Sequence, residues 1–182
     1  MEKSILINGK LRMKNGKLRH PFEPIIDKKS EILILGTFPS IKSFETDFYY
    51  GHPRNQFWDI LSIIFNDKKP DTVNKKIDFV KKHKIALWDA ICECMREKGN
   101  SRDDNLKEIK PCPLENLLKN YRNIKKVTVT SRLAENVIKK HFKNSPFSIL
   151  HSPVYLPSPS PLNARINLNE KAEKWKKLLQ LM

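Results

Sequence analysis

Short apolar segments alternate with amphipathic segments along this chain, and that alternation limits the fold more than any other feature. Four segments of strand length are rich in apolar or β-branched residues, at residues 31–36 (EILILG), 85–88 (IALW), 126–130 (KVTVT) and 147–150 (FSIL). Such runs are typical of strands buried on both faces of a parallel sheet. Because helical segments separate them, we predict an α/β fold with three layers, α/β/α, around a central, mostly parallel four-stranded sheet.

Helical periodicity fills the intervals between these segments. We expect helices over residues 55–66, 71–82, 113–120, a stretch following Ser131, and 164–181. Asp71 and Ser131 belong to the residue types that cap helix N-termini, and proline, as at Pro113, suits the first position of a helix. Residues 1–30 read as an N-terminal arm, in which two Asn-Gly pairs favour a β-hairpin.

Length and composition exclude several classes of protein. A chain of 182 residues with 39% hydrophobic residues fits a single domain over residues 1–182. No apolar run approaches the roughly 20 residues of a membrane span, and the N-terminus lacks the core of a signal peptide. We therefore expect a cytoplasmic protein in a reducing compartment, a monomer, with no membrane partner.

The sequence gives no sign of a metal site or a cofactor. Three cysteines (Cys92, Cys94 and Cys112) are too few for a disulfide framework or a four-cysteine iron–sulfur cluster, so we interpret them as core or incidental thiols. The five histidines have no metal-ligand spacing. The net charge of +15 favours a polyanionic partner such as nucleic acid, although a solvated lysine-rich surface explains it as well.

Two loops should lie at the functional edge of the predicted sheet. In open parallel sheets, ligands bind outside the carboxyl ends of the strands. That rule selects residues 36–56, after the first predicted strand, and residues 151–163, after the last.

The first loop is rich in groups that suit a planar ligand. It contains GTFPS at residues 36–40 and YYGHPRNQFW at residues 49–58. Gly36 lets a ligand approach the backbone, and aromatic rings offer a surface on which a base can stack. Asn55 either caps the apolar helix that follows or holds a water or a base edge, and capping is the simpler interpretation. His52 contacts a base or phosphate, or makes a structural hydrogen bond. At least one of Phe57 and Trp58 should belong to the core.

The second loop, LPSPSPLN at residues 156–163, alternates proline with serine and is therefore stiff. Serine hydroxyls and backbone N–H groups on a rigid loop can meet phosphate oxygens with little loss of entropy. Leu162 would form an apolar wedge between stacked bases. The alternative is a plain rigid connector, and Arg165 beyond it binds phosphate or faces solvent.

Together, these two loops resemble those of the uracil-DNA glycosylase superfamily. SPSPLN at residues 158–163 is similar to the second motif of that superfamily, commonly HPSPLS, and GTFP at residues 36–39 falls where the first motif reads GQDP or GINP. YGHPRNQFW at residues 50–58 resembles the FAHPxNxFW stretch of the mismatch-specific branch. The full pattern most resembles the hypoxanthine (deoxyinosine) DNA glycosylase branch, from about His20 to the C-terminal helix.

Two departures shape what the resemblance implies. Phe38 stands where other branches place the Asp or Asn that positions water, and Ser158 stands where the uracil-specific branch has a catalytic histidine. The resemblance implies that Asn55 takes the catalytic, water-positioning role and that Tyr50 stacks on the flipped base. It implies a base pocket of Gly36, Thr37, Phe38, Pro39, Ser40, Tyr50 and His52. It implies DNA contacts from Arg54, Ser158, Pro159, Ser160, Pro161, Leu162, Asn163 and Arg165.

The implied activity is that of a monofunctional DNA N-glycosylase. It would act on double-stranded DNA, flip out a deaminated base, above all hypoxanthine, hydrolyse its N-glycosidic bond and leave an abasic site. A uracil or G/U mismatch glycosylase of the same fold is one alternative. A non-catalytic nucleic-acid-binding module is another, because Phe38 and Ser158 replace the usual catalytic residues.

Two acidic segments have open interpretations. Asp89 follows a predicted strand and binds a base edge or caps a helix. Asp103, Asp104 and Asn105 either frame the pocket or form a solvated polar loop, which is the interpretation we favour.

Overall fold

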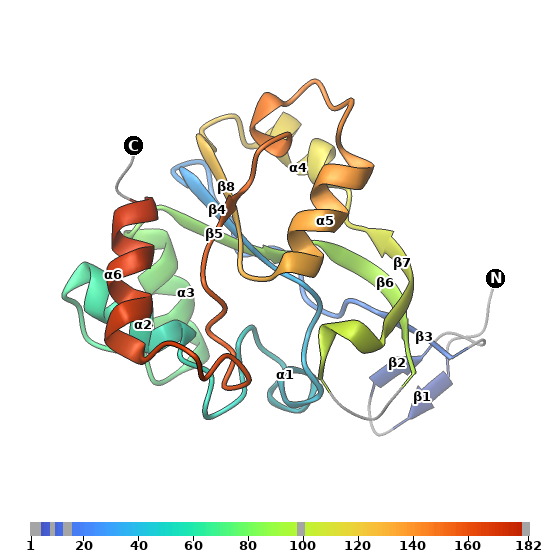
Figure 1. The fold of residues 1–182 in the computed structure, drawn as a ribbon, viewed down its shortest axis with the longest axis horizontal. Coiled ribbons are helices and arrows are strands. Elements are labelled where there is room, and N and C mark those ends of the chain that lie inside the picture. The colour runs from blue at the N-terminus through green and yellow to red at the C-terminus, as the bar shows by residue number, and fades with distance from the viewer. Residues whose placement is uncertain (1–4, 8–9, 13–15, 98–100, 180–182) are drawn as a thin grey trace.

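A four-stranded parallel sheet forms the centre of the molecule, as predicted. The structure is a computed structural model that describes residues 5–7, 10–12, 16–97 and 101–179. The central sheet has the order β5-β4-β8-β9, and all neighbouring strands run parallel (Figure 1). These strands are β4 (Ile32–Gly36), β5 (Ile85–Asp89), β8 (Lys126–Val129) and β9 (Val154–Tyr155).

Helices cover both faces of this sheet and give the predicted three layers. On one side lie α2 (Phe57–Phe65), α3 (Val73–Lys82) and α6 (Leu168–Leu179), and on the other lie α4 (Leu114–Asn120) and α5 (Arg132–His141) (Figure 1). Every residue of β4 and β5 is buried, which explains why both strands are apolar at consecutive positions.

The starts of the helices follow local hydrogen bonding. Ser131 Oγ accepts a hydrogen bond from the Ala134 N–H at 3.0 Å, so the predicted cap of α5 is confirmed. The prediction that Asp71 caps α3 is wrong, because the Thr72 hydroxyl takes that place and Asp71 pairs with Lys75. A short helix that was not predicted from the sequence, α1 (Ile41–Thr46), begins after Ser40, which caps it.

The prediction of a strand at residues 147–150 is wrong. These residues form a 3₁₀ turn, η2 (Ser148–Leu150), and the fourth strand of the sheet is β9, a few residues later. The Leu150 and His151 N–H groups bond to the carbonyls three residues before them, so they are satisfied locally rather than in a ladder. A four-residue apolar run does not distinguish a buried strand from a single buried turn.

A second sheet, antiparallel and of order β1-β2-β3-β6-β7, packs beside the first. The N-terminal arm supplies β1 (Ile5–Ile7) and β2 (Lys10–Arg12), which pair as the predicted hairpin, and β3 (Lys17–Arg19). The strands β6 (Ile91–Arg96) and β7 (Leu106–Pro111), joined through η1 (Asp103–Asn105), complete it. Through β3, the arm is attached to the segment that follows β5.

The interpretation of all three cysteines as thiols is wrong for Cys92 and Cys112. Cys92 in β6 forms a disulfide with Cys112, just after β7, because the antiparallel pairing brings the two residues side by side. Cys94 is a free, buried thiol, as expected of a core residue. Burial raises the pKa of the Cys94 thiol to about 11. Across the described ranges, no helix has both the length and the apolar character needed to cross a membrane.

Candidate functional site

The two loops selected from the sequence meet at the carboxyl edge of the central sheet. The Gln56 N–H donates a hydrogen bond to the Pro159 carbonyl at 3.0 Å, which ties the segment before α2 to the proline-serine loop. A cleft of about 750 Å³ opens between them, within the usual size range of a ligand site.

All sixteen residues predicted for the site line this cleft. From the first loop these are Gly36, Thr37, Phe38, Pro39, Ser40, Tyr50, His52, Arg54 and Asn55, and from the second Ser158, Pro159, Ser160, Pro161, Leu162, Asn163 and Arg165. The cleft is also lined by residues that the prediction left out, namely Phe22, Ser43, Tyr49, Asp89, Ser101, Arg102, Asp103, Thr130, Ser131, Arg132 and Tyr155. The chemical roles of the sixteen stay predictions.

Asn55 binds the first backbone N–H of α2 and also lines the cleft. Its Oδ1 accepts a hydrogen bond from the Phe57 N–H at 3.0 Å, but Gln56 is the N-cap residue of α2, so Asn55 satisfies the first turn from one position before the cap. The Asn55 N–H donates to the His52 carbonyl at 2.8 Å, which fixes the turn that carries the side chain. Within the described part of the chain, the Asn55 amide nitrogen has no hydrogen-bond partner. Its N–H groups are therefore available to a water or a base.

The Tyr50 ring stacks on another aromatic ring of the protein. It lies on the Phe57 ring with the centroids 3.7 Å apart and 4° between the planes. Phe57 is fully buried, so one of the two first-loop rings expected in the core is confirmed there, and Trp58 is buried too. Because Phe57 covers one face of Tyr50, a base can stack only on the opposite face. Burial raises the pKa of the Tyr50 phenol far above its usual value, so the hydroxyl stays neutral.

His52 makes the local hydrogen bond that was one of its two interpretations. Its Nδ1 accepts from the Arg54 N–H at 3.1 Å, and the side chain still borders the cleft. Arg54 and Arg165 are exposed at the rim, where a phosphate backbone would pass.

Phe38 forms an apolar wall in place of a water-positioning side chain. It is 8% exposed, and its ring packs edge-on against the His20 ring with the centroids 5.9 Å apart. Arg96 lies behind it and donates from Nη2 to the Pro39 carbonyl at 3.0 Å. Phe38 therefore gives the cleft an apolar wall but has no polar group that could position a water.

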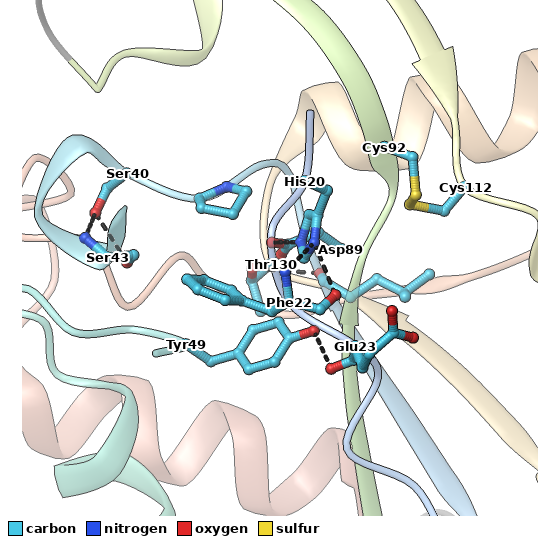
Figure 2. A network of polar contacts seen from close by, with 12 residues as sticks. His20, Phe22, Glu23, Ser40, Ser43, Tyr49, Asp89, Cys92, Cys112 and Thr130 are labelled. Atoms are coloured by element: carbon cyan, nitrogen blue, oxygen red, sulfur yellow. Dashed lines mark hydrogen bonds and ion pairs between the residues drawn. A yellow bond between two sulfur atoms is a disulfide. The ribbon is translucent and has the colours of Figure 1, made fainter. Parts of the chain in front are cut away.

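A buried, hydrogen-bonded pair of side chains, His20 and Asp89, lies beside the cleft and was not predicted from the sequence. Asp89 is the last residue of β5, and its Oδ2 lies 2.7 Å from His20 Nε2, with the two side chains 8% and 2% exposed (Figure 2). A Cβ added to Gly36 would collide with Asp89 Oδ1 and lie 3.4 Å from the Tyr50 hydroxyl oxygen. Glycine at position 36 is thus what lets the carboxylate lie across β4. The position of Asp89 after an apolar strand was a usable signal, but nothing local marked His20.

Asp103 is a wall of the cleft, so the interpretation of its segment as a solvated loop is wrong for this residue. Thr37 Oγ1 donates to Asp103 Oδ2 at 2.9 Å and lies 2.6 Å from Ser131 Oγ. Burial raises the pKa of Asp103, and hydrogen bonds from Thr37 and Ser131 oppose that rise. Asp104 is exposed and paired with Arg102, whereas Asn105 is buried.

The proline-serine loop is braced from within. Ser158 Oγ accepts from the Ser160 N–H at 3.3 Å, and Asn163 Nδ2 donates to the Ser158 carbonyl at 3.1 Å. Ser160 Oγ likewise accepts from the Leu162 N–H at 3.3 Å, so the hydrogen of each of these two hydroxyls is left to donate to a phosphate. Leu162 at the tip is 69% exposed, the arrangement expected of a wedge.

Side chains of the C-terminal helix, α6, donate hydrogen bonds to carbonyl groups of this loop. Trp175 Nε1 donates to the Pro157 carbonyl at 2.9 Å, and Lys171 Nζ donates to Gln56 Oε1 at 2.7 Å and to the Asn163 carbonyl at 2.8 Å. Burial lowers the pKa of Lys171. Over the described ranges, no three His, Cys, Asp or Glu side chains gather as metal ligands do.

Comparison with known proteins gives one matching family. The model of the uracil DNA glycosylase superfamily matches residues 23–180, a stretch that begins just after His20. A hypoxanthine DNA glycosylase of Methanosarcina barkeri (strain Fusaro / DSM 804) is 42% identical over 88 residues, which are 48% of this chain and 54% of that protein. A hypoxanthine DNA glycosylase of Methanosarcina acetivorans is 35% identical over 81 residues, 44% of this chain and 51% of that protein.

This chain therefore spans about half the length of the curated relatives it matches. A solved structure extends the likeness of fold. The solution NMR structure of a Methanosarcina acetivorans protein assigned as a uracil DNA glycosylase superposes with a TM-score of 0.71 at 23% identity, over 89% of this chain and 99% of that one. The α/β/α arrangement is thus shared across nearly the whole of both chains.

Proposed function

The chain belongs to the uracil DNA glycosylase superfamily, and on that premise we propose that it is a monofunctional DNA N-glycosylase that removes hypoxanthine from double-stranded DNA. It would act inside the cell on chromosomal DNA, leave an abasic site and need no cofactor. The named hypoxanthine DNA glycosylases among its relatives support the choice of base.

One observation carries the proposal. The two motif-bearing loops, more than 100 residues apart in sequence, are joined by the bond between Gln56 and Pro159 and line a single cleft. Neither loop alone makes a base pocket. Together they line the cleft: Asn55 and Tyr50 come from the first loop, and the exposed Leu162 comes from the second.

The first step is extrusion of the base from the duplex. The rigid proline-serine loop presses on the phosphate backbone, and Leu162 fills the gap that the base leaves. The base enters between the free face of Tyr50 and the wall formed by Phe38. Arg54 and Arg165 at the rim hold the phosphates on either side.

Asp89 gives the pocket a means of recognising deamination. Adenine has a bare ring nitrogen at N1, an acceptor, whereas hypoxanthine carries a proton there and is a donor. A carboxylate accepts hydrogen bonds and donates none when ionised. Asp89 Oδ1 would therefore attract hypoxanthine N1–H and repel the N1 lone pair of adenine.

Hydrolysis then needs only a positioned water and stabilised charge. The C1′–N9 bond breaks with its electron pair going to the base, and the sugar passes through an oxocarbenium-like state. The water held by the Asn55 amide adds its oxygen to C1′ and loses a proton, and the departing base gains one. The products are neutral hypoxanthine and an abasic sugar, and positioning supplies much of the rate enhancement.

Uracil is the second candidate, because its N3–H is also a donor that Asp89 could accept. The test uses end-labelled duplexes that each carry one hypoxanthine, one uracil or only normal bases, incubated with the protein and then cleaved with alkali. We expect strand breaks at hypoxanthine. Breaks at uracil alone would support the second candidate, and no breaks at all would support a non-catalytic binding module.

A further inference from the structure

His20 lies outside the cleft but binds Asp89, the residue that would recognise the base. It is absent from the cleft lining, whereas its partner Asp89 is part of that lining. His20 directly follows β3, and its backbone N–H donates a hydrogen bond to the Cys92 carbonyl in β6 at 2.8 Å. The N-terminal arm therefore delivers this histidine to the far side of Asp89.

Aromatic rings lock the imidazole in place. The Phe22, Phe38 and Tyr49 rings have their centroids 5.6, 5.9 and 6.0 Å from the His20 centroid. Figure 2 shows His20 and Asp89 facing each other with Phe22 and Tyr49 beside them. The imidazole therefore holds one orientation, with Nε2 toward the carboxylate.

The backbone of Phe22 offers His20 Nδ1 a hydrogen-bond partner whether or not that nitrogen carries a proton. Its carbonyl lies 3.0 Å from His20 Nδ1 and its N–H lies 3.2 Å from the same atom. A neutral ring accepts the N–H at Nδ1, and an imidazolium donates to the carbonyl from Nδ1. In either state the proton on Nε2 points at Asp89 Oδ2.

The second oxygen of Asp89 is the one left for a ligand. His20 is the only hydrogen-bond partner of Asp89 side-chain oxygens in the described part of the chain, and it binds Oδ2. Oδ1 lies against Gly36 at the cleft wall. A donor that fixes Oδ2 keeps the carboxylate turned so that Oδ1 acts as an acceptor.

We propose that His20 is a positioning residue for base selection: by binding Asp89 Oδ2, it holds Oδ1 as the acceptor for the ring N–H that deamination creates. This inference rests on the proposed function. It gives the N-terminal arm a role, since without β3 no described residue would hold Asp89. A site built to accept a substrate N–H discriminates strongly against a base that lacks it.

The test compares two bases in single-turnover excision. Hypoxanthine carries the N1 proton and 1-methylhypoxanthine does not. The variants are His20→Phe, which keeps an aromatic ring but removes the donor, and His20→Gln, whose amide can still donate to Asp89. His141→Gln is the control, because His141 is exposed on α5 and outside the cleft. Thermal melting of each variant reports whether it is folded.

We expect the wild type to prefer hypoxanthine strongly. In His20→Phe the rate on hypoxanthine should fall about 10- to 100-fold while the rate on 1-methylhypoxanthine stays the same, and His20→Gln should recover much of the preference. Equal losses on both bases, or an unchanged ratio in folded His20→Phe and His20→Gln, would overturn the inference. If the wild type excises neither base, the proposed function itself fails, which is a different result.

Discussion

The ammonium group of Lys171 donates a hydrogen bond to Gln56 Oε1 over 2.7 Å, although the lysine is only 1% exposed. A second bond, to the Asn163 carbonyl at 2.8 Å, connects the same ammonium to the other wall of the cleft. Among the described residues Lys171 has no carboxylate partner. One buried cation therefore joins the segment that carries Asn55 to the loop that carries Leu162.

Replacing Lys171 should loosen this connection. Lys171→Met leaves the Gln56 amide and the Asn163 carbonyl without their donor, and we expect the free energy of unfolding to fall by about 1–3 kcal/mol. Excision of paired hypoxanthine should fall as well, because the two walls lose their fixed spacing. Chemical denaturation and excision rates check this, with Lys174→Met, exposed on the same helix, as control. Equal behaviour of the two variants would contradict this role of Lys171.

Leu162 should matter for paired DNA and not for single strands. Its side chain is 69% exposed at the tip of the braced loop, where it can replace an extruded base in the stack. We expect Leu162→Ala to slow excision from a duplex by about tenfold or more and to leave excision from a single strand nearly unchanged, since unstacking costs a few kcal/mol only in the duplex. Ile63→Ala, at an exposed apolar position of α2, is the matched control. A loss of the same size on both substrates would rule out a wedge.

Arg54 should contribute to DNA affinity without choosing the base. It is exposed at the rim of the cleft, where it can neutralise one phosphate. Binding of Arg54→Ala to a hypoxanthine duplex and to an undamaged duplex should weaken by a similar factor, and the slope of log K against log salt should shrink by about 1. Lys119→Ala, exposed on α4, should leave both the affinity and the slope as in the wild type. A change confined to the hypoxanthine duplex would mean that Arg54 contacts the base instead.

The sequence was most informative where burial or chain order sets the structure. Ile32–Gly36 is buried on both faces, so its unbroken apolar run predicted the central strand directly. The rule that ligands bind at the carboxyl ends of parallel strands then brought residues 36–56 and 151–163 together, and all sixteen predicted residues line one cleft. Local pattern was sufficient for these features.

The rest depends on contacts between residues far apart in sequence. His20 and Asp89 are separated by 69 positions, and the pair forms only because β3 docks on β6. The disulfide of Cys92 with Cys112 depends on the same antiparallel sheet, in whose strands β6 and β7 burial does not follow a regular two-residue alternation. Lys171 gave no sign of burial, because a lysine on an amphipathic helix is usually exposed.

Acid should weaken the end of the sheet opposite the cleft. Glu31 binds Lys84 and Lys125 at 2.6 and 2.8 Å, and hydrogen bonds from Lys125 and Lys84 lower its pKa from 4.5 to about 2. Since the folded state holds the charged form, this contribution is present above pH 4.5 and is lost as the pH falls toward 2. Between these values, the free energy of unfolding of Glu31→Gln should fall less steeply than that of the wild type. Parallel pH curves for the two proteins would disprove the contribution.

The central claim is that Asn55 directs hydrolysis in this cleft, and single-turnover excision of hypoxanthine from a duplex, with protein in excess, tests it most directly. Asn55→Ala loses both the hydrogen bond to the Phe57 N–H and the amide, whereas Asn55→Ser keeps an oxygen for the Phe57 N–H and loses only the amide. Asn116→Ala, exposed on α4, is the control. We predict that both Asn55 variants lose about 10²- to 10³-fold in rate while their affinity for the duplex stays within a few-fold of the wild type. Wild-type excision rates in folded Asn55→Ala would contradict the claim.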